Sequence, residues 1–341
     1  MSTTSTRRAL PALALPLLLL AAACGGSSAS AGNASTGATN KLVVAASVAP
    51  ITSIVSAVGG DRIELHGIVP EGVNSHTFEP APKVAQLLST ADIVFVNGLK
   101  LEDPTAELAT SNAKKGSEIV ALGTKSLPES QYIYDFSFPE KEGKPNPHLW
   151  TDPLFAIKYA DEAAATLSAK DPANKAYYEA NRVTFDKKAT ELSDALKTAQ
   201  ATIPGGKKEL LTYHDAYAYF GRDYGWKIIG AVQPSNFEDP TAKDVVSLIT
   251  QIRSEKVPVI FGSEVFPSKI LAQIAKESGA RYESSLRDDD LPGKPGDNEH
   301  SWFGLMRYDY RTMVKGLGGD PAALDALNIS STTPDKADYP Q

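Results

Sequence analysis

Short runs of consecutive apolar residues recur along the chain and alternate with stretches of helical periodicity. Such runs are typical of strands that are buried on both faces of a parallel sheet. Strands separated by helical stretches indicate βαβ units, so the pattern predicts an α/β fold with mostly parallel sheets. The expected strands lie at 42–48, 63–69, 92–98, 118–122, 209–213, 227–232 and 257–262, and the expected helices at 50–58, 84–88, 241–254 and 267–278.

One long helical stretch separates two such groups of elements. Its apolar residues follow one another at steps of three and four and form a single stripe, namely Phe185, Ala189, Leu192, Leu196, Ala199 and Ile203. A helix of about 30 residues is roughly 45 Å long, enough to run along two lobes. The folded part of the chain also exceeds what one compact core usually covers. We therefore expect an N-terminal α/β lobe at 41–170, a long linking helix at 171–204 and a C-terminal α/β lobe at 205–333.

The first 40 residues have a different composition, which predicts export. Residues 1–23 combine Arg7 and Arg8 with an apolar run that ends in small residues, the pattern of a secretory signal peptide. The run is shorter than the roughly 20 apolar residues that a membrane span needs. Cys24 follows three alanines, and this arrangement resembles the lipobox of bacterial lipoproteins, in which the cysteine becomes the lipidated N-terminus. Residues 24–40 are rich in Gly, Ser and Ala and are expected to form a flexible tether.

Charge and cysteine content limit the classes of partner. Removal of residues 1–23 takes away two arginines and leaves 32 basic and 41 acidic side chains, a net charge of −9 with neutral histidines. An acidic chain is a poor match for nucleic acid, so we expect no nucleic-acid partner. Cys24 is the only cysteine, which excludes an intramolecular disulfide. We expect an extracytoplasmic monomer that is anchored to the cell membrane by lipidated Cys24.

Three of the five histidines share a sequence context that points to a joint site. His76, His148 and His214 each lie where a strand or an apolar run gives way to a loop or a helix. Because ligands collect at the carboxyl ends of strands in open α/β sheets, these side chains can converge. Neutral imidazole is a good ligand for transition metals. For His148 alone, a buried structural role, a catalytic base and a metal ligand remain alternatives.

The surroundings of the histidines refine these expectations. Pro147 restricts the backbone beside His148, and we expect Trp150 to pack behind the His148 ring. His66 lies inside an expected strand, so we expect it to be structural. His300 has polar neighbours and is expected at the surface.

An acidic run supplies candidates for a fourth ligand, because three imidazoles leave a tetrahedral ion one ligand short. The run consists of Asp288, Asp289 and Asp290. A solvated loop and an EF-hand calcium loop are the alternatives for it, but Pro292 falls where a calcium loop needs an oxygen-bearing side chain. Further carboxylates either orient the imidazoles or serve as surface and capping groups, namely Glu79, Asp215 and Glu264.

Four blocks of the sequence resemble the zinc/manganese substrate-binding proteins of bacterial ABC importers, also described as metal-receptor lipoproteins. The blocks lie in order between about residues 42 and 318, and they read HTFEPAPKVAQLLSTADIVFVNGLKLED, NPHLWTDPLFAIKYADEAAATLSAKDPANKAYYEAN, LLTYHDAYAYFGRDYGWKI and HSWFGLMRYDYRTMVKGLGG. The resemblance implies two α/β lobes joined by one long helix. It also implies a metal ion in the cleft between the lobes, with two ligands from each lobe.

Block-by-block matching places the family's metal ligands on residues of this chain. The first three fall on His76, His148 and His214, and the fourth falls on Asp289. Asp288 and Asp290 remain alternatives through a slip of one residue. The chain has Asn-Ser-His where the family commonly has Asp-Pro-His at the first ligand, and it has an aspartate at 309 where an asparagine is frequent, but neither change removes a ligand.

The resemblance implies a receptor that binds a divalent transition metal and delivers it to the permease of an ABC importer. Three histidines and one aspartate favour Zn²⁺ as the transported ion, with Mn²⁺ as the second candidate. Against zinc, the segment before His148 lacks the histidines that many zinc-type members carry there. The alternative function is a secreted metal-dependent hydrolase. A catalytic zinc keeps a position open for water, whereas four protein ligands close the shell, and the common hydrolase motifs are absent from the sequence.

Overall fold

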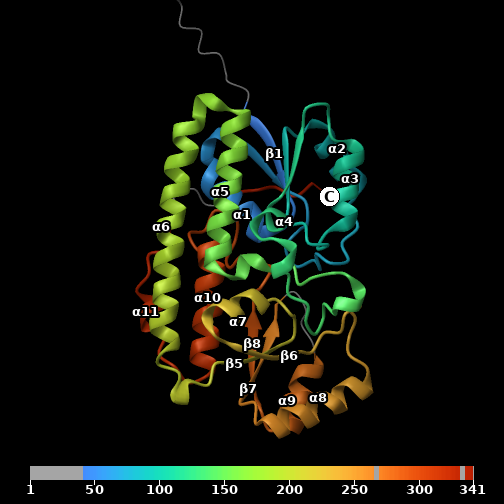
Figure 1. The fold of residues 1–341 in the computed structure, drawn as a ribbon, viewed down its shortest axis with the longest axis vertical. Coiled ribbons are helices and arrows are strands. Elements are labelled where there is room, and N and C mark those ends of the chain that lie inside the picture. The colour runs from blue at the N-terminus through green and yellow to red at the C-terminus, as the bar shows by residue number, and fades with distance from the viewer. Residues whose placement is uncertain (1–40, 265–268, 331–334, 341) are drawn as a thin grey trace, which may run out of the picture. The chain divides into compact units, whose positions relative to one another are not determined.

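The computed structural model describes residues 41–264, 269–330 and 335–340. Two four-stranded sheets, both wholly parallel, form the centres of an N-terminal and a C-terminal lobe (Figure 1). The α/β fold with two lobes, predicted from the alternation of apolar runs and helical stretches, is therefore confirmed. The predicted signal peptide, the tether and Cys24 lie outside the described residues.

The first sheet has the strand order β2-β1-β3-β4. Its central strands β1 (Leu42–Ala46) and β3 (Ile93–Val96) are largely buried, which explains their nearly continuous apolar sequence. The edge strands β2 (Ile63–Gly67) and β4 (Glu118–Ala121) contain both buried and more exposed positions. The order of the strands reverses between β1 and β3, so the carboxyl ends of the strands provide a place for a ligand there.

The second sheet repeats this order as β6-β5-β7-β8. It consists of β5 (Glu209–Thr212), β6 (Lys227–Ala231), β7 (Val259–Ser263) and β8 (Arg281–Leu286). The hydrophobic pattern did not predict β8, because its mixed sequence RYESSL contains no run of apolar residues. The two lobes thus share one topology, although the sequence shows no repeat.

Helices cover both sheets. The N-terminal lobe contains α1 (Ala49–Gly59), α2 (Pro82–Thr90), α3 (Asp103–Asn112) and α4 (Leu122–Ser126), and the C-terminal lobe contains α7 (Ala218–Tyr224), α8 (Ala242–Glu255), α9 (Lys269–Ser278), α10 (Trp302–Gly316) and α11 (Ala322–Asp325). The expected helices correspond to α1, α2, α8 and α9, and the expected start of the last falls on residues that the structure does not describe. Within the described part of the chain, no helix combines the length and the apolar character that a membrane span requires.

In the sequence, two long helices, α5 (Pro153–Lys170) and α6 (Lys175–Gln200), separate the strands of the first sheet from those of the second. In space the two helices lie side by side (Figure 1). Helix α6 lies within the range predicted for the linking helix, and a 3₁₀ turn over Pro172–Asn174 precedes it. Its buried residues include Phe185 and Leu196, and the helix contacts α5 and α1 as well as α10 and α11. Its 26 residues give a length of about 39 Å.

After α11 the chain returns to the N-terminal lobe. Asp338 forms an isolated parallel bridge with His66 of the edge strand β2, and the Gly67 N–H donates to the Asp338 carbonyl at 2.8 Å. The His66 Nδ1 atom lies 2.6 Å from the Asp338 carboxylate, so this histidine of β2 has a structural partner, as expected. The buried Asp335 carboxylate accepts a hydrogen bond from Thr52 of α1 at 2.8 Å. This tail covers an outer edge of the first sheet.

Candidate metal centre

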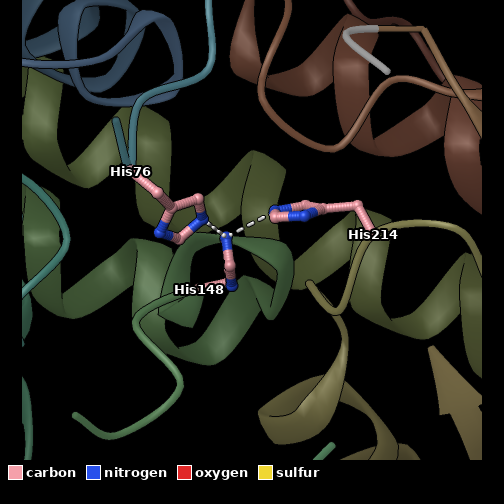
Figure 2. Close-up of side chains that lie close together, drawn as sticks. All are labelled: His76, His148 and His214. Atoms are coloured by element: carbon pink, nitrogen blue, oxygen red, sulfur yellow. Dashed lines mark hydrogen bonds between the residues drawn. The ribbon is translucent and has the colours of Figure 1, made fainter. Parts of the chain in front are cut away.

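Three imidazoles converge where the two lobes meet (Figure 2). The Nε2 atom of His148 lies 3.3 Å from that of His76 and 2.9 Å from that of His214. His76 comes from the loop after β2, His148 precedes the 3₁₀ turn that leads into α5, and His214 follows β5. The structure therefore brings together all three histidines that the sequence pattern selected.

The separations of the three nitrogens suit a small metal ion. Ligand nitrogens that are 2.0–2.1 Å from a tetrahedral zinc ion lie about 3.3 Å from one another. One separation in the structure is 3.3 Å, one is 2.9 Å, and the ligand atoms of the group all lie within 4.8 Å of one another. Only small shifts of the rings are needed to place an ion between them.

The orientation of the His148 ring follows from its neighbour Asn146. The Asn146 Nδ2 atom faces only acceptors, the Asp215 carbonyl at 2.9 Å and the Asp135 carboxylate at 3.2 Å. Its Oδ1 atom must therefore be the group that faces His148, where it accepts from the backbone N–H at 3.1 Å and from ring Nδ1 at 2.9 Å. His148 thus carries its proton on Nδ1, and the Nε2 lone pair faces the other two histidines.

Gln233 orients His214 by the same logic. Its Nε2 atom donates to the Phe237 carbonyl at 3.3 Å, so its Oε1 atom faces His214 Nδ1, at 2.7 Å. His214 then carries a proton on Nδ1 and presents Nε2 to the site. Gln233 follows β6 and is only 2 % exposed, so a buried amide holds the His214 ring.

Of the three aspartates in the acidic run, Asp289 is the one that faces the histidines. Its Oδ2 atom lies 4.0 Å from His214 Nε2 and accepts a hydrogen bond from Ser75 Oγ at 3.4 Å. Its Oδ1 atom is buried and has no hydrogen-bond partner among the described residues. Burial of a carboxylate oxygen costs free energy unless a cation or a hydrogen-bond donor contacts it, so Asp289 Oδ1 is suited to bind a metal ion.

The neighbouring aspartates have other partners. The Asp288 carboxylate accepts from Ser263 Oγ at 3.3 Å, and both oxygens of Asp290 accept from the Gly72 N–H, at 3.0 and 2.8 Å. The buried Asp309 of α10 accepts from the backbone N–H groups of Arg287 and Asp288 at 2.8 and 3.2 Å. These bonds fix the loop after β8 and turn the Asp289 side chain toward the imidazoles. A strand precedes Asp288, in contrast to the helix of an EF-hand.

Burial keeps the histidines neutral. Desolvation lowers the pKa of His76 and His148 well below the ordinary value and that of His214 to about 4, and neighbouring imidazoles lower the first two further. Desolvation, followed by the charge of Asp290, raises the pKa of Asp289 to about 7. Neutral imidazole is the form that binds a metal ion, so the histidines are ready for coordination at neutral pH.

Aromatic side chains surround the ligands. The Trp150 ring lies 5.0 Å from the His148 ring in an edge arrangement, which confirms that Trp150 packs against His148. Phe138 lies 5.5 Å from His76, and Phe237 stacks on His76 at a centroid distance of 4.2 Å and an interplanar angle of 8°. The sequence analysis missed both phenylalanines, because they lie in irregular loops with no periodicity to place them.

The remaining sequence candidates lie outside the ligand group. Asp215 is buried, and its backbone carbonyl accepts from Asn146 at 2.9 Å and also bonds to His148. Glu264 pairs with Arg287 at 2.5 Å, and Glu79 is exposed. The expectation that His300 lies at the surface was wrong, since it is 2 % exposed and lies 3.7 Å from Glu71. The reason is that α10 begins directly after it and is docked against α1.

Comparison with known proteins identifies the family. A family model described as ZnuA, zinc-uptake complex component A, periplasmic, matches residues 44–316. The metal ABC transporter substrate-binding lipoprotein FimA of Streptococcus parasanguinis is 29 % identical over 83 % of this chain and 91 % of its own length. The manganese ABC transporter substrate-binding lipoprotein PsaA of Streptococcus pneumoniae is 27 % identical over 84 % and 93 %.

A solved structure supports the same fold. The periplasmic zinc-binding protein TroA of Treponema pallidum superimposes with a TM-score of 0.74 at 23 % identity and covers 81 % of this chain and 99 % of its own. The family model and the two lipoproteins confirm the resemblance seen in the four sequence blocks, and no finding supports the hydrolase alternative. The chain belongs to the family of periplasmic zinc-uptake component A proteins, which are metal-binding receptors of ABC transporters and not enzymes.

Proposed function

We propose that this receptor binds one Zn²⁺ ion, with Mn²⁺ as the second candidate, through His76, His148, His214 and Asp289. The observation that carries the proposal is the convergence of three oriented imidazoles beside an Asp289 oxygen that has no partner among the described residues. Three nitrogen ligands and one carboxylate form the kind of shell that zinc prefers, whereas manganese favours shells with more oxygen. The naming of PsaA for manganese keeps that ion as a candidate.

The receptor then delivers the ion to the permease of an ABC importer. The proposal places a signal peptide at 1–23, lipidation at Cys24 and a tether at 24–40, so that a monomer remains attached to the outer side of the cell membrane. It places the lobes at 41–170 and 205–333, with the linking helix within 171–204. The naming of FimA and PsaA as lipoproteins supports the anchor.

Competition titration of chelator-stripped protein with Zn²⁺ and Mn²⁺ tests the ligand set. The wild type should bind one Zn²⁺ ion per chain, and His148→Ala and Asp289→Asn should each weaken binding by at least about 100-fold, because each removes a ligand from a four-membered shell. Asp290→Asn is the matched control, since the Asp290 carboxylate is occupied by the Gly72 N–H.

The possible results are distinct. Preference for Mn²⁺ over Zn²⁺ would keep the site and change the transported ion. Equal loss in Asp289→Asn and Asp290→Asn would mean that the acidic loop acts as a whole and that Asp289 is no ligand. Absence of binding by the wild type would overturn the proposal.

A further inference from the structure

His76 differs from the other two histidines in how its ring is held. His148 and His214 each have an amide oxygen within 2.9 Å of Nδ1. For His76, the bonds found among the described residues are one from its backbone N–H to Asn74 Oδ1 and one between Nε2 and His148. A metal-binding histidine usually has a hydrogen bond at its second nitrogen that fixes the plane of the ring. Another contact must therefore fix the plane of His76.

The stacked ring of Phe237 provides that contact. The His76 and Phe237 rings are nearly parallel, with an interplanar angle of 8° and a centroid distance of 4.2 Å. The centroid of the Phe138 ring lies 5.8 Å from that of Phe237. Phe237 comes from the loop between β6 and α8 of the C-terminal lobe, whereas His76 comes from the N-terminal lobe. The stack therefore orients a ligand of one lobe from the other.

The backbone of Phe237 is strained to make this contact. Its φ angle is +59°, in the left-handed region that bulky residues rarely adopt. Gln233, which orients His214, also donates to the Phe237 carbonyl, and Phe237 N–H donates to the Pro234 carbonyl at 3.0 Å. A strained conformation that is held by several bonds at a binding site points to a role in the site.

We propose that Phe237 is a positioning residue for His76 that slows release of the metal ion. The inference rests on the proposed function of the site. An imidazole that binds a cation becomes electron-poor, and the face of a phenyl ring attracts such a group, so the stack strengthens when the ion is bound. The same ring covers one face of His76 and hinders access of water to the ligand.

Zinc release from the preloaded full-length chain into excess chelator tests this role. Phe237→Ala should release Zn²⁺ about 2–10-fold faster than the wild type, the change expected for the loss of one aromatic pair. Phe237→Tyr keeps the stack and should release within about twofold of the wild type. Phe136→Ala is the control, because Phe136 lies in the same segment as Phe138 but is 50 % exposed.

A glycine variant separates the ring from the backbone. Phe237→Gly removes the ring as Phe237→Ala does, but it relieves the strain at φ +59°. It should release zinc as fast as Phe237→Ala and unfold at a higher temperature than that variant. A purely structural role predicts instead that release follows thermal stability, so slower release from the glycine variant than from the alanine variant would overturn the inference.

Two further outcomes are decisive. Release from Phe237→Ala at the wild-type rate, or release from Phe237→Tyr as fast as from Phe237→Ala, would overturn the positioning role. A His76→Ala variant that binds zinc like the wild type would also overturn it, because His76 would then be no ligand. Failure of the wild type to bind zinc is a separate result that removes the proposed function itself.

Discussion

Asn146 offers a direct test of whether second-sphere hydrogen bonds create the metal site. This side chain is fully buried and forms bonds in two directions, to His148 through Oδ1 and to Asp135 and Asp215 through Nδ2. In Asn146→Ala the His148 ring loses the acceptor that keeps its proton on Nδ1. The ring can then rotate or place its proton on Nε2, the atom that faces the metal.

The expected size of the effect follows from the number and kind of bonds that are lost. Loss of a second-sphere partner of a metal-binding histidine typically reduces affinity by about 10–100-fold, which is roughly 1.4–2.7 kcal/mol. The variant also removes buried hydrogen bonds to Asp215 and His148, so the free energy of unfolding should fall by about 1–3 kcal/mol. We therefore expect Asn146→Ala to lose both zinc affinity and stability, whereas a variant that is only less stable should keep its affinity.

Zinc affinity measured by chelator competition and unfolding by denaturant test the two effects together. Asn181→Ala is the control. The Asn181 amide of α6 donates to the Val58 carbonyl of α1 at 2.9 Å, and neither residue belongs to the site. That variant should lose stability but keep its zinc affinity. If Asn146→Ala folds and binds zinc as tightly as Asn181→Ala does, the orientation of His148 does not depend on Asn146 and the reasoning fails.

Two further predictions concern buried groups around the site. Burial raises the pKa of Glu102 to about 7 from an ordinary 4.5, so the folded chain binds more protons than the unfolded chain between these values and the free energy of unfolding falls as pH rises through them. In Glu102→Gln this fall should be smaller by about 3 kcal/mol. Denaturant titrations of metal-free protein at pH 4.5 and 8 test this, and the assignment is refuted if the free energy of unfolding changes equally with pH in the wild type and the variant. Trp150→Phe removes the indole donor to the Asp288 carbonyl and should cost about 1–3 kcal/mol of stability and reduce zinc affinity several-fold. Trp302→Phe, which removes an indole donor to the Trp150 carbonyl, should cost similar stability with a smaller change in affinity, and equal affinities in the two variants would contradict a role for Trp150 in placing Asp289.

The sequence predicted the strands that contain a run of apolar residues. Central strands such as β1 and β3 must be apolar on both faces, so a run of apolar residues identifies them. The edge strand β8 has the polar sequence RYESSL with no such run, so the pattern missed it. This omission matters, because β8 leads directly into the loop that carries Asp289.

The convergence of the histidines was predictable for a related reason. The carboxyl ends of parallel strands meet at one edge of a sheet, so chemistry-bearing residues that follow strands can meet there. The partners that orient the rings could not be found in this way. Asn146 contacts Asp215, which lies 69 residues away in the sequence, and Gln233 contacts His214, which lies 19 residues away. The stacking of Phe237 depends on a left-handed backbone conformation that the local sequence does not predict.

The contacts that orient the ligands also join the two lobes. Asn146 reaches from the segment before α5 to the Asp215 carbonyl, Ser137 Oγ donates to the Gln233 carbonyl at 2.6 Å, and Phe237 stacks on His76. The lobes therefore cannot move apart at this place without loosening the three imidazoles of the proposed ligand set. An ion that binds only to oriented imidazoles stabilises the arrangement in which these contacts are made, and its departure removes that stabilisation. With the proposed ligand set, binding of the ion and the arrangement of the two lobes are therefore coupled, because the same contacts orient the imidazoles and join the lobes.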